Sequence, residues 1–302
     1  MEKVFFIVGP TGVGKSELAA EVAASLNGEI VGADAFQIYG GLDLLTGKPD
    51  AATLGRVPHH LISTTSVAEP MNAERFRAAA ACAIADIYSR GKQAFVVGGS
   101  GMYVHALTHG LSPLPAADPE LRVELAKQTT AELLAQLRGL DPETAAKIDG
   151  QNRHRIVRAL EICVLTGRPA AELRNRTEPT QQPQGVLISR DRAELNERID
   201  QRVIGMFREG VLAEVQAARE PGVTAHKTLG LRQIRDLIEG YISEAECIAQ
   251  IQQATRRYAK RQLTWFRRQT NFEPLNLSLL GSSEAIELIT RKARLSFAQR
   301  ND

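Results

Sequence analysis

The chain has 302 residues, of which 43% are hydrophobic and 24% charged, and its formal net charge is +2. This composition is that of a globular protein, and it excludes a disordered chain, which needs low hydrophobicity and high net charge. Three cysteines, Cys82, Cys163 and Cys247, are too few for a disulfide framework and lack the spacing of metal ligands. The cysteine pattern therefore predicts a reducing compartment, and we expect the cytoplasm. No apolar run reaches the length of a membrane span.

The small net charge conceals an uneven distribution of charged residues. Residues 201–302 carry 16 cations and 11 acids, whereas acids slightly outnumber cations in residues 1–200. Arginine is the preferred cation for planar contacts with phosphates and bases, and it is the commoner cation in this chain. A solvated basic surface is the usual meaning of such a bias, and a nucleic-acid partner is the alternative.

The first part of the chain alternates short apolar runs with helical patterns. Consecutive apolar residues predict buried strands, and apolar residues spaced three or four apart predict helices. The predicted strands lie at residues 4–8, 29–33 and 94–97, and the predicted helices at 16–26 and 73–88. Strands that alternate with helices in this way predict a parallel α/β sheet.

The pattern becomes helical after Gly110. Asp118-Pro119-Glu120 has the composition of a helix start, and helical patterns continue to about Arg176. A polar, proline-containing linker follows, and the apolar run at 186–188 predicts a strand that returns to the sheet. We therefore predict a P-loop α/β core with a helical C-terminal region, formed by residues 1–112 and 183–302, and a mostly helical insertion domain at residues 113–182.

Residues 9–16, which read GPTGVGKS, match the phosphate-loop pattern G-x-x-x-x-G-K-[ST]. Glycines allow successive backbone N–H groups to point at phosphate oxygens, and the following helix directs its positive end to the anion. Lys15 adds a compact positive charge, and the Ser16 hydroxyl is suited to binding Mg²⁺. The predicted phosphate-binding residues are Gly9, Pro10, Thr11, Gly12, Val13, Gly14, Lys15 and Ser16.

Asp34 follows the second predicted strand and is a candidate proton acceptor. The strand at 94–97 ends in Gly98-Gly99 instead of the acidic residue that holds Mg²⁺ in ATP-driven motors, which argues against a motor. Because the carboxyl ends of parallel strands share the ligand-binding edge, we expect Asp34 to face the crevice of the phosphate loop. A turn or helix-capping role for Asp34 is the equally weighted alternative.

Residues 254–268 contain six cations and no acid. On a helix, Arg257, Arg261 and Arg268 share one face, with apolar side chains such as Phe266 roughly opposite. A basic stripe of this kind suits contact with a phosphate backbone, and aromatic side chains can stack on bases. The alternative is a solvated face whose aromatic residues pack inward.

Seven separated segments of the chain carry a further signal through their order, and they are residues 9–16, 34–39, 46–49, 57–62, 97–103, 155–161 and 255–267. Together they resemble the bacterial tRNA dimethylallyltransferases of the IPP transferase family. The resemblance covers nearly the whole chain. It implies transfer of a dimethylallyl group from dimethylallyl diphosphate to N6 of adenosine 37 in tRNA, with Mg²⁺, with release of diphosphate and without a requirement for ATP.

The resemblance also implies roles for individual residues. Asp34 would act as the catalytic base and Arg202 would contact the diphosphate, together with Lys15 and Ser16. The positions that match tRNA contacts of the family are Asp34, Ala35, Phe36, Gln37, Ser100, Arg122, His154, Arg155, Ile156, Val157 and Arg158. From the basic helix we add Arg256, Arg257 and Arg261 to the predicted tRNA contacts.

Some of these residues have a structural role as the alternative. We interpret His59 and His60 as structural, and Arg158 with Glu161 is alternatively an ordinary surface helix pair.

Two other classes of protein are alternatives to the tRNA prenyltransferase. One is a small-molecule kinase whose loop binds ATP, and the other is a nucleic-acid-binding module with a regulatory loop. For the tRNA prenyltransferase, the expected partners are a tRNA anticodon stem-loop and dimethylallyl diphosphate. We expect no membrane partner, and we expect a monomer.

Overall fold

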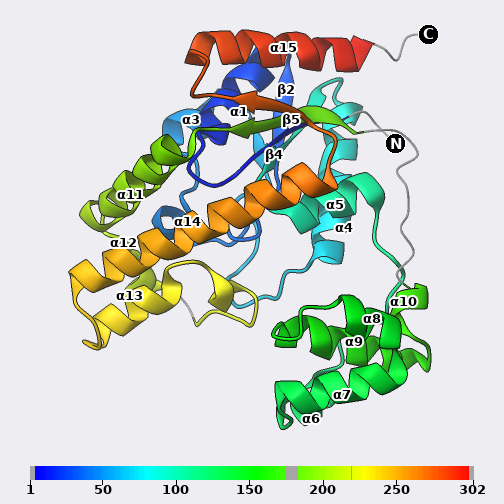
Figure 1. The fold of residues 1–302 in the computed structure, drawn as a ribbon. Helices are drawn as coiled ribbons and strands as arrows, with labels where there is room; N and C mark the ends of the chain where they lie inside the picture. Colours follow the sequence, from blue (N-terminus) through cyan, green and yellow to red (C-terminus); the bar gives the residue numbers. More distant parts are fainter. Residues whose placement is uncertain (1–3, 174–182, 219, 299–302) are drawn as a thin grey trace. The chain divides into compact units, whose positions relative to one another are not determined.

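The computed structural model describes residues 4–173, 183–218 and 220–298 (Figure 1). The chain forms two compact units: a core unit of residues 1–108 and 180–302, and an insertion unit of residues 109–179. The polar linker with Pro179 lies partly outside the described residues.

The core unit is built on a six-stranded sheet in the order β3-β2-β4-β1-β5-β6, with every neighbouring pair parallel. Its strands are β1 (Val4–Val8), β2 (Gly28–Gly32), β3 (His59–His60), β4 (Gln93–Gly98), β5 (Gln184–Ser189) and β6 (Glu273–Asn276). The predicted parallel α/β class is thus confirmed.

The two outermost strands differ from the prediction. We expected the chain after Leu195 to be largely helical and predicted no strand within it, and the structure adds β6, which extends the sheet beside β5. Pro274 lies within β6, and a residue without an N–H is tolerated there because β6 is an edge strand. Strand β3 has only two residues, too few to produce a pattern in the sequence.

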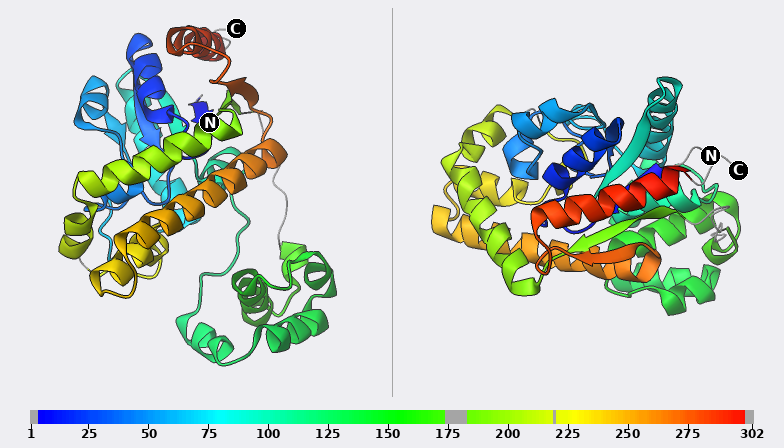
Figure 2. Two further views of the ribbon diagram at one scale, coloured as in Figure 1. Left: turned by 60° about the vertical axis from the view of Figure 1, so that its left-hand side comes forward. Right: turned by 90° about the horizontal axis from the view of Figure 1, so that it is seen from above.

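Helices cover both faces of the sheet (Figures 1 and 2). The helices of the core unit are α1 (Lys15–Ser25), α2 (Asp43–Thr46), α3 (Ala51–Arg56), α4 (Ala73–Ser89), α5 (Gly101–His109), α11 (Arg192–Arg208), α12 (Val211–Ala217), α13 (Leu231–Ile238), α14 (Glu244–Gln269) and α15 (Ser282–Ala298), with a 3₁₀ turn at Ala225–Lys227. Alternate residues of β1 face opposite cores: Phe5 and Ile7 pack with α1 and α15, while Phe6 and Val8 pack with α4 and Phe266 of α14. This two-sided burial explains the continuous apolar runs of the strands.

One carboxylate interrupts the apolar core. Glu29 of β2 is fully buried and accepts hydrogen bonds from Arg90, and it pairs with Lys92 at 2.8 Å and with His60 Nε2 at 2.7 Å. The hydrogen bonds from Arg90 hold the pKa of Glu29 well below its usual range, although burial acts in the opposite direction. The Nδ1 atom of the neighbouring His59 contacts the Val57 carbonyl at 2.8 Å, whereas its Nε2 atom is buried without a hydrogen-bond partner among the described residues.

The insertion unit is a small helical bundle with its own core. Its helices are α6 (Pro119–Ala126), α7 (Thr130–Leu140), α8 (Pro142–Lys147), α9 (Arg153–Thr166) and α10 (Ala170–Leu173). The predicted helix start is confirmed, because Asp118 caps α6 by accepting from Leu121 N at 3.0 Å and Pro119 is its first residue. Leu133, Leu137 and residues of α9 form the apolar centre.

Helix α14 is the longest in the part of the chain that the structure describes, with 26 residues. A capping box formed by Ser243 and Glu246 fixes its start. Its buried positions recur at intervals of three and four, which gives one inward face, and they are Cys247, Ile251, Thr255, Ala259, Gln262 and Phe266. Neither α14 nor any other helix in the described ranges is long and apolar enough to cross a membrane.

Candidate functional site

The phosphate loop joins β1 to α1 at the carboxyl edge of the sheet. Gly12 and Gly14 have φ values of +81° and +95°, a region that L side chains rarely adopt, and Gly14 is the residue before α1. Gly9 has a different requirement, because a Cβ atom there would lie 2.4 Å from the Ile188 carbonyl oxygen of β5. The local sequence thus fixes both the shape of the loop and its close contact with the neighbouring strand.

Two cations and one carboxylate meet beside this loop. The Lys15 ammonium donates to the Pro10 carbonyl at 2.6 Å, and burial lowers its pKa to about 8, with Asp34 raising it and Arg202 lowering it further. Burial also lowers the pKa of Arg202, and the Asp34 carboxylate opposes that effect. The structure therefore brings together three of the residues assigned to catalysis, although they come from α1, the end of β2 and α11.

Two further arginines, which we did not predict, lie against the same loop. Arg198 Nε donates to the Gly12 carbonyl and Arg190 Nε to the Val13 carbonyl, both at 3.0 Å. A Cβ atom at Gly14 would lie 3.5 Å from one terminal nitrogen of Arg198 and 3.8 Å from one of Arg190. The signal that the sequence offered was the four-residue spacing of Arg198 and Arg202, which places both on one side of a helix.

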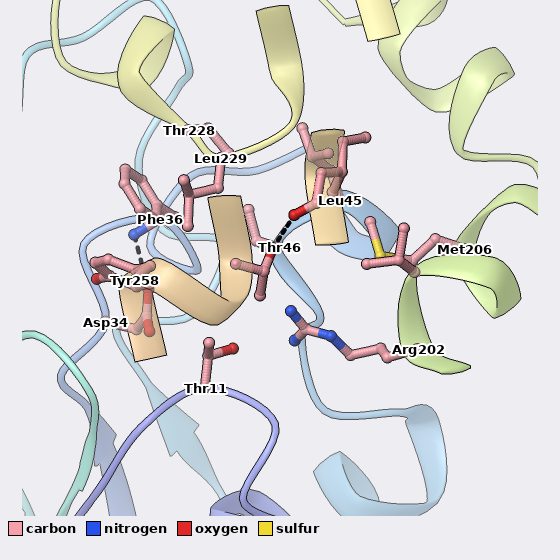
Figure 3. Close-up of a pocket in the computed structure, with 13 residues that line it drawn as sticks. Thr11, Asp34, Phe36, Leu45, Thr46, Arg202, Met206, Thr228, Leu229 and Tyr258 are labelled. Carbon is pink, nitrogen blue, oxygen red and sulfur yellow. Dashed lines mark hydrogen bonds between the residues drawn. The ribbon is translucent and has the colours of Figure 1, made fainter. Parts of the chain in front are cut away.

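The Asp34 carboxylate makes the turn that the sequence offered as one alternative, and it also lines a pocket. Its Oδ1 accepts from the backbone N–H groups of Phe36 at 2.9 Å and Gln37 at 3.4 Å, which is the geometry of an Asx turn. The same side chain lines a pocket together with Thr11 and Arg202 (Figure 3). The turn therefore orients the carboxylate toward the pocket.

This pocket, which we call the Asp34 pocket, has a polar part and an apolar part (Figure 3). It is lined by Thr11, Asp34, Phe36, Leu45, Thr46, Arg202, Val203, Met206, Thr228, Leu229, Ile251, Thr255 and Tyr258. Arg202 Nε is among the buried side-chain atoms of the described residues that have no hydrogen-bond partner. Because an unpartnered buried donor is costly, this atom points to an acceptor supplied by a ligand.

The residues after β2 and β4 that match tRNA contacts lie together. Ser100 Oγ accepts from Ala35 N at 2.8 Å, and Gln37 Nε2 donates to the Gly47 carbonyl at 2.8 Å. The ring centroid of Phe36 lies 6.1 Å from that of Tyr258 on α14. Ser100 is buried, so its hydroxyl supports the Asp34 turn.

The basic face of α14 is only partly as expected. Arg257 and Arg261 are exposed, and the Arg261 guanidinium lies 5.7 Å from the centre of the Tyr258 ring. Arg256 is half-buried and forms an ion pair with Asp200 of α11. The first two arginines are therefore accessible to a large polyanion, whereas Arg256 already has a counter-charge.

The remaining predicted contacts lie in the insertion unit, on α6 and α9. His154 and Arg155 are exposed, whereas the Ile156 side chain is fully buried in the helical core, and Val157 is half-buried. Apolar packing against α7 explains the burial of the Ile156 side chain in the core of the insertion unit.

Arg122 and Arg158 share one carboxylate within the insertion unit, that of Glu161. Arg122 Nε and Nη2 donate to it at 2.8 and 2.9 Å, and Arg158 Nη1 donates at 2.5 Å. The alternative of an ordinary surface pair is wrong, because Glu161 is fully buried. The arginines themselves are partly exposed, with 40% of the Arg122 side chain and 27% of the Arg158 side chain accessible.

A parallel sheet with a phosphate loop after β1, a carboxylate after β2 and buried cations beside them defines a P-loop α/β protein. The model of the IPP transferase family matches residues 37–269. The chain belongs to the IPP transferase family, which confirms the resemblance inferred from its motifs.

Individual relatives agree with this assignment. The chain is 44% identical over 283 residues to the tRNA dimethylallyltransferase of Akkermansia muciniphila, a match that covers 93% of this chain and 96% of the relative. It is 44% identical over 271 residues to tRNA dimethylallyltransferase 1 of Citrifermentans bemidjiense, covering 87% and 89%.

Solved structures are similar over comparable lengths. The full-length tRNA isopentenylpyrophosphate transferase of Bacillus halodurans has 32% sequence identity and a TM-score of 0.72, and the match covers 99% of this chain and 98% of that one. A eukaryotic dimethylallyltransferase acting on tRNA has 25% identity and a TM-score of 0.74, with 91% and 74% covered.

Proposed function

We propose that this protein transfers the dimethylallyl group of dimethylallyl diphosphate to N6 of adenosine 37 in tRNA and releases diphosphate. The observation that carries the proposal is the Asp34 pocket, where a carboxylate, a buried arginine and apolar side chains meet beside the phosphate loop. The relatives named tRNA dimethylallyltransferase support the same activity.

The diphosphate of the substrate fits the cationic side of the site. Arg202 Nε needs an acceptor, and Lys15 lies in the phosphate loop with its pKa at about 8. A diphosphate that accepts hydrogen bonds from both groups and from loop N–H groups becomes a better leaving group, since its negative charge grows as the C–O bond breaks. The Arg198 guanidinium adds positive potential next to Gly14, whereas that of Arg190 is already paired with Glu194.

Mg²⁺ fits this arrangement at Ser16. The residue lies in the first turn of α1, next to Lys15, and its side chain is a hard oxygen ligand. Magnesium usually keeps several waters and binds through few protein groups and substrate phosphates, so a single hydroxyl from the protein is sufficient. When bound, the ion neutralises charge on the leaving diphosphate.

The apolar part of the pocket suits the five-carbon prenyl group. Leu45, Val203, Met206 and Ile251 are at most 5% exposed and line the pocket. Leu45 and Met206 lie on the same side of the pocket as Arg202 (Figure 3). Burial of the hydrocarbon among them excludes water from the allylic carbon, which protects a carbon that loses its leaving group easily.

Asp34 is suited to accept the proton from the acceptor amine. The adenine N6 forms a bond to the allylic carbon, the bond from that carbon to the diphosphate oxygen breaks, and the N6 proton passes to the Asp34 carboxylate. Burial raises the pKa of Tyr258 above its usual value, and Asp34 raises it further, so Tyr258 keeps its proton and is not the base.

The tRNA partner is supported by exposed cations in both units. Arg257 and Arg261 on α14, and Arg155 on α9, are accessible to a phosphate backbone, and the neighbouring His154 is exposed as well. The target adenosine is in a single-stranded loop, so moving it out of the base stack costs less than in a duplex. The monomeric state and the cytoplasmic location stay predictions from the sequence.

An assay of diphosphate release tests the function. The protein is incubated with unmodified tRNA, Mg²⁺ and dimethylallyl diphosphate without ATP, and diphosphate release is measured with and without tRNA. We expect release that depends on tRNA. ATP-dependent phosphorylation of a small hydroxyl acceptor, with no release of diphosphate from the prenyl donor, would overturn the proposal in favour of a kinase.

A further inference from the structure

One buried side chain of α14 connects the phosphate loop to the turn after β4. The Gln262 Oε1 atom accepts a hydrogen bond from the Thr11 backbone N–H at 2.9 Å. Its Nε2 atom donates to the Gly99 carbonyl at 2.8 Å. Gln262 is only 5% exposed, so both hydrogen bonds form away from bulk water.

The hydrogen bond to Gln262 Oε1 uses a backbone N–H group of the phosphate loop. The Thr11 N–H is one of the loop amides, and because it donates to Gln262 its direction is set by α14. A side-chain amide suits this place, since it accepts at one end and donates at the other at every pH. Neither a carboxylate nor an apolar side chain of the same length does both.

The contact with Gln262 needs a residue without a side chain at Gly99. A Cβ atom on Gly99 would lie 2.3 Å from Gln262 Nε2 and 3.1 Å from the Gly9 carbonyl oxygen, so a larger residue there would displace the amide. The loops after β1 and β4 therefore meet across Gln262, which lies 251 positions from Thr11 in the sequence.

We propose that Gln262 is a positioning residue that holds the phosphate loop in the shape that binds diphosphate. It acts through Thr11 and Gly99 and not through contact with the substrate. The inference rests on the proposed function only in the identity of the ligand. Because α14 fixes the loop in advance, binding of diphosphate does not have to include the cost of ordering it.

The test compares Gln262→Met with Gln253→Met, which makes the same substitution at an exposed position of α14. Calorimetry gives the dissociation constants of inorganic diphosphate and of dimethylallyl diphosphate, and filter binding gives that of tRNA. We expect Gln262→Met to raise the dissociation constants of both diphosphate ligands by about tenfold, because two buried hydrogen bonds are lost. The control variant should match the wild type, and tRNA affinity should be almost unchanged in both.

A second variant separates positioning from a general loss of structure. In Gln262→Glu the carboxylate still accepts from Thr11 N–H, but when ionised it faces the Gly99 carbonyl without a proton to donate. We expect its affinity for inorganic diphosphate, taken as a ratio to the wild type at each pH, to recover as the pH falls and the carboxyl gains a proton. A structural defect would leave this ratio independent of pH.

Two results would overturn the inference: wild-type diphosphate affinity in Gln262→Met, or a Gln262→Glu defect that does not change with pH. Inorganic diphosphate is the probe for both, so these results do not depend on prenyl transfer. Failure of the wild type to prenylate tRNA would instead count against the proposed function alone.

Discussion

Glu161 and Arg122, 39 positions apart in the sequence, form a two-point ion pair inside the insertion unit, with N···O distances of 2.8 and 2.9 Å. The Glu161 carboxylate also accepts from Arg158 and from the Asp118 backbone N–H. Burial alone would raise the pKa of Glu161, but these hydrogen bonds outweigh burial and keep it below its usual value. One buried anion thus orients two arginines that are predicted to contact tRNA.

Glu161→Gln should therefore destabilise the protein. Two guanidinium groups lose their buried counter-charge, and we expect the free energy of unfolding to fall by about 3 kcal/mol, measured by urea denaturation. Arg168→Gln is a suitable control, because it removes a cation from an exposed pair with Glu172. An equal loss of unfolding free energy in the two variants would show that the buried Glu161 carboxylate stabilises the protein no more than an exposed ion pair does.

The same carboxylate should contribute to acid unfolding. Because the pKa of Glu161 is lower in the folded protein than in the unfolded chain, its stabilisation is present above the unfolded value and is lost as the pH falls through the folded value. Urea titrations at several acidic pH values should show a shallower loss of stability in Glu161→Gln than in the wild type. Parallel curves would contradict this assignment.

Lys15 should impose a pH dependence on binding of the prenyl donor. Its pKa is about 8 in the free site, so the ammonium loses its charge as the pH rises through this value. We expect the dissociation constant of dimethylallyl diphosphate to rise about tenfold above pH 8, as a charged hydrogen bond is lost. Lys15→Arg, which stays protonated, should remove this dependence, and its persistence would assign it to another group.

Asp34→Asn tests the base without removing the turn. The amide oxygen can still accept from Phe36 and Gln37, so the loop should keep its shape, whereas the side chain can no longer take a proton. We expect turnover to fall about 100-fold to 10,000-fold with tRNA affinity almost unchanged. If tRNA affinity fell as steeply as turnover in filter-binding assays, Asp34 would be a binding residue.

The arginines of α14 should differ in their contribution to tRNA affinity. Each exposed arginine that meets a phosphate adds about 0.7–0.9 to the salt slope of binding, so Arg257→Ala and Arg261→Ala should each reduce it. Arg256→Ala should have a smaller effect, since Arg256 is paired with Asp200. Arg291→Ala on α15 is the control for loss of an exposed positive charge. Equal slopes in all four variants would make the basic face a solvated surface.

Local patterns in the sequence were enough to predict the phosphate loop, the parallel class of the sheet and the start of α6. Each depends on neighbours in sequence, such as the Gly-rich turn before Lys15 or Asp118 before Pro119. The contact between Gln262 and Thr11 has no local signal, because its partners are far apart in the chain. Burial of Glu161 was missed for the same reason: its charge partner Arg122 belongs to another helix.

Product analysis tests the central claim most directly. Unmodified tRNA is incubated with the wild type, Mg²⁺ and dimethylallyl diphosphate without ATP, and the tRNA is then digested and examined by mass spectrometry. The account predicts N6-(dimethylallyl)adenosine derived from position 37 with the wild type and none with Asp34→Asn. A prenyl group on another nucleoside, or no prenylated nucleoside from the wild type, would contradict it.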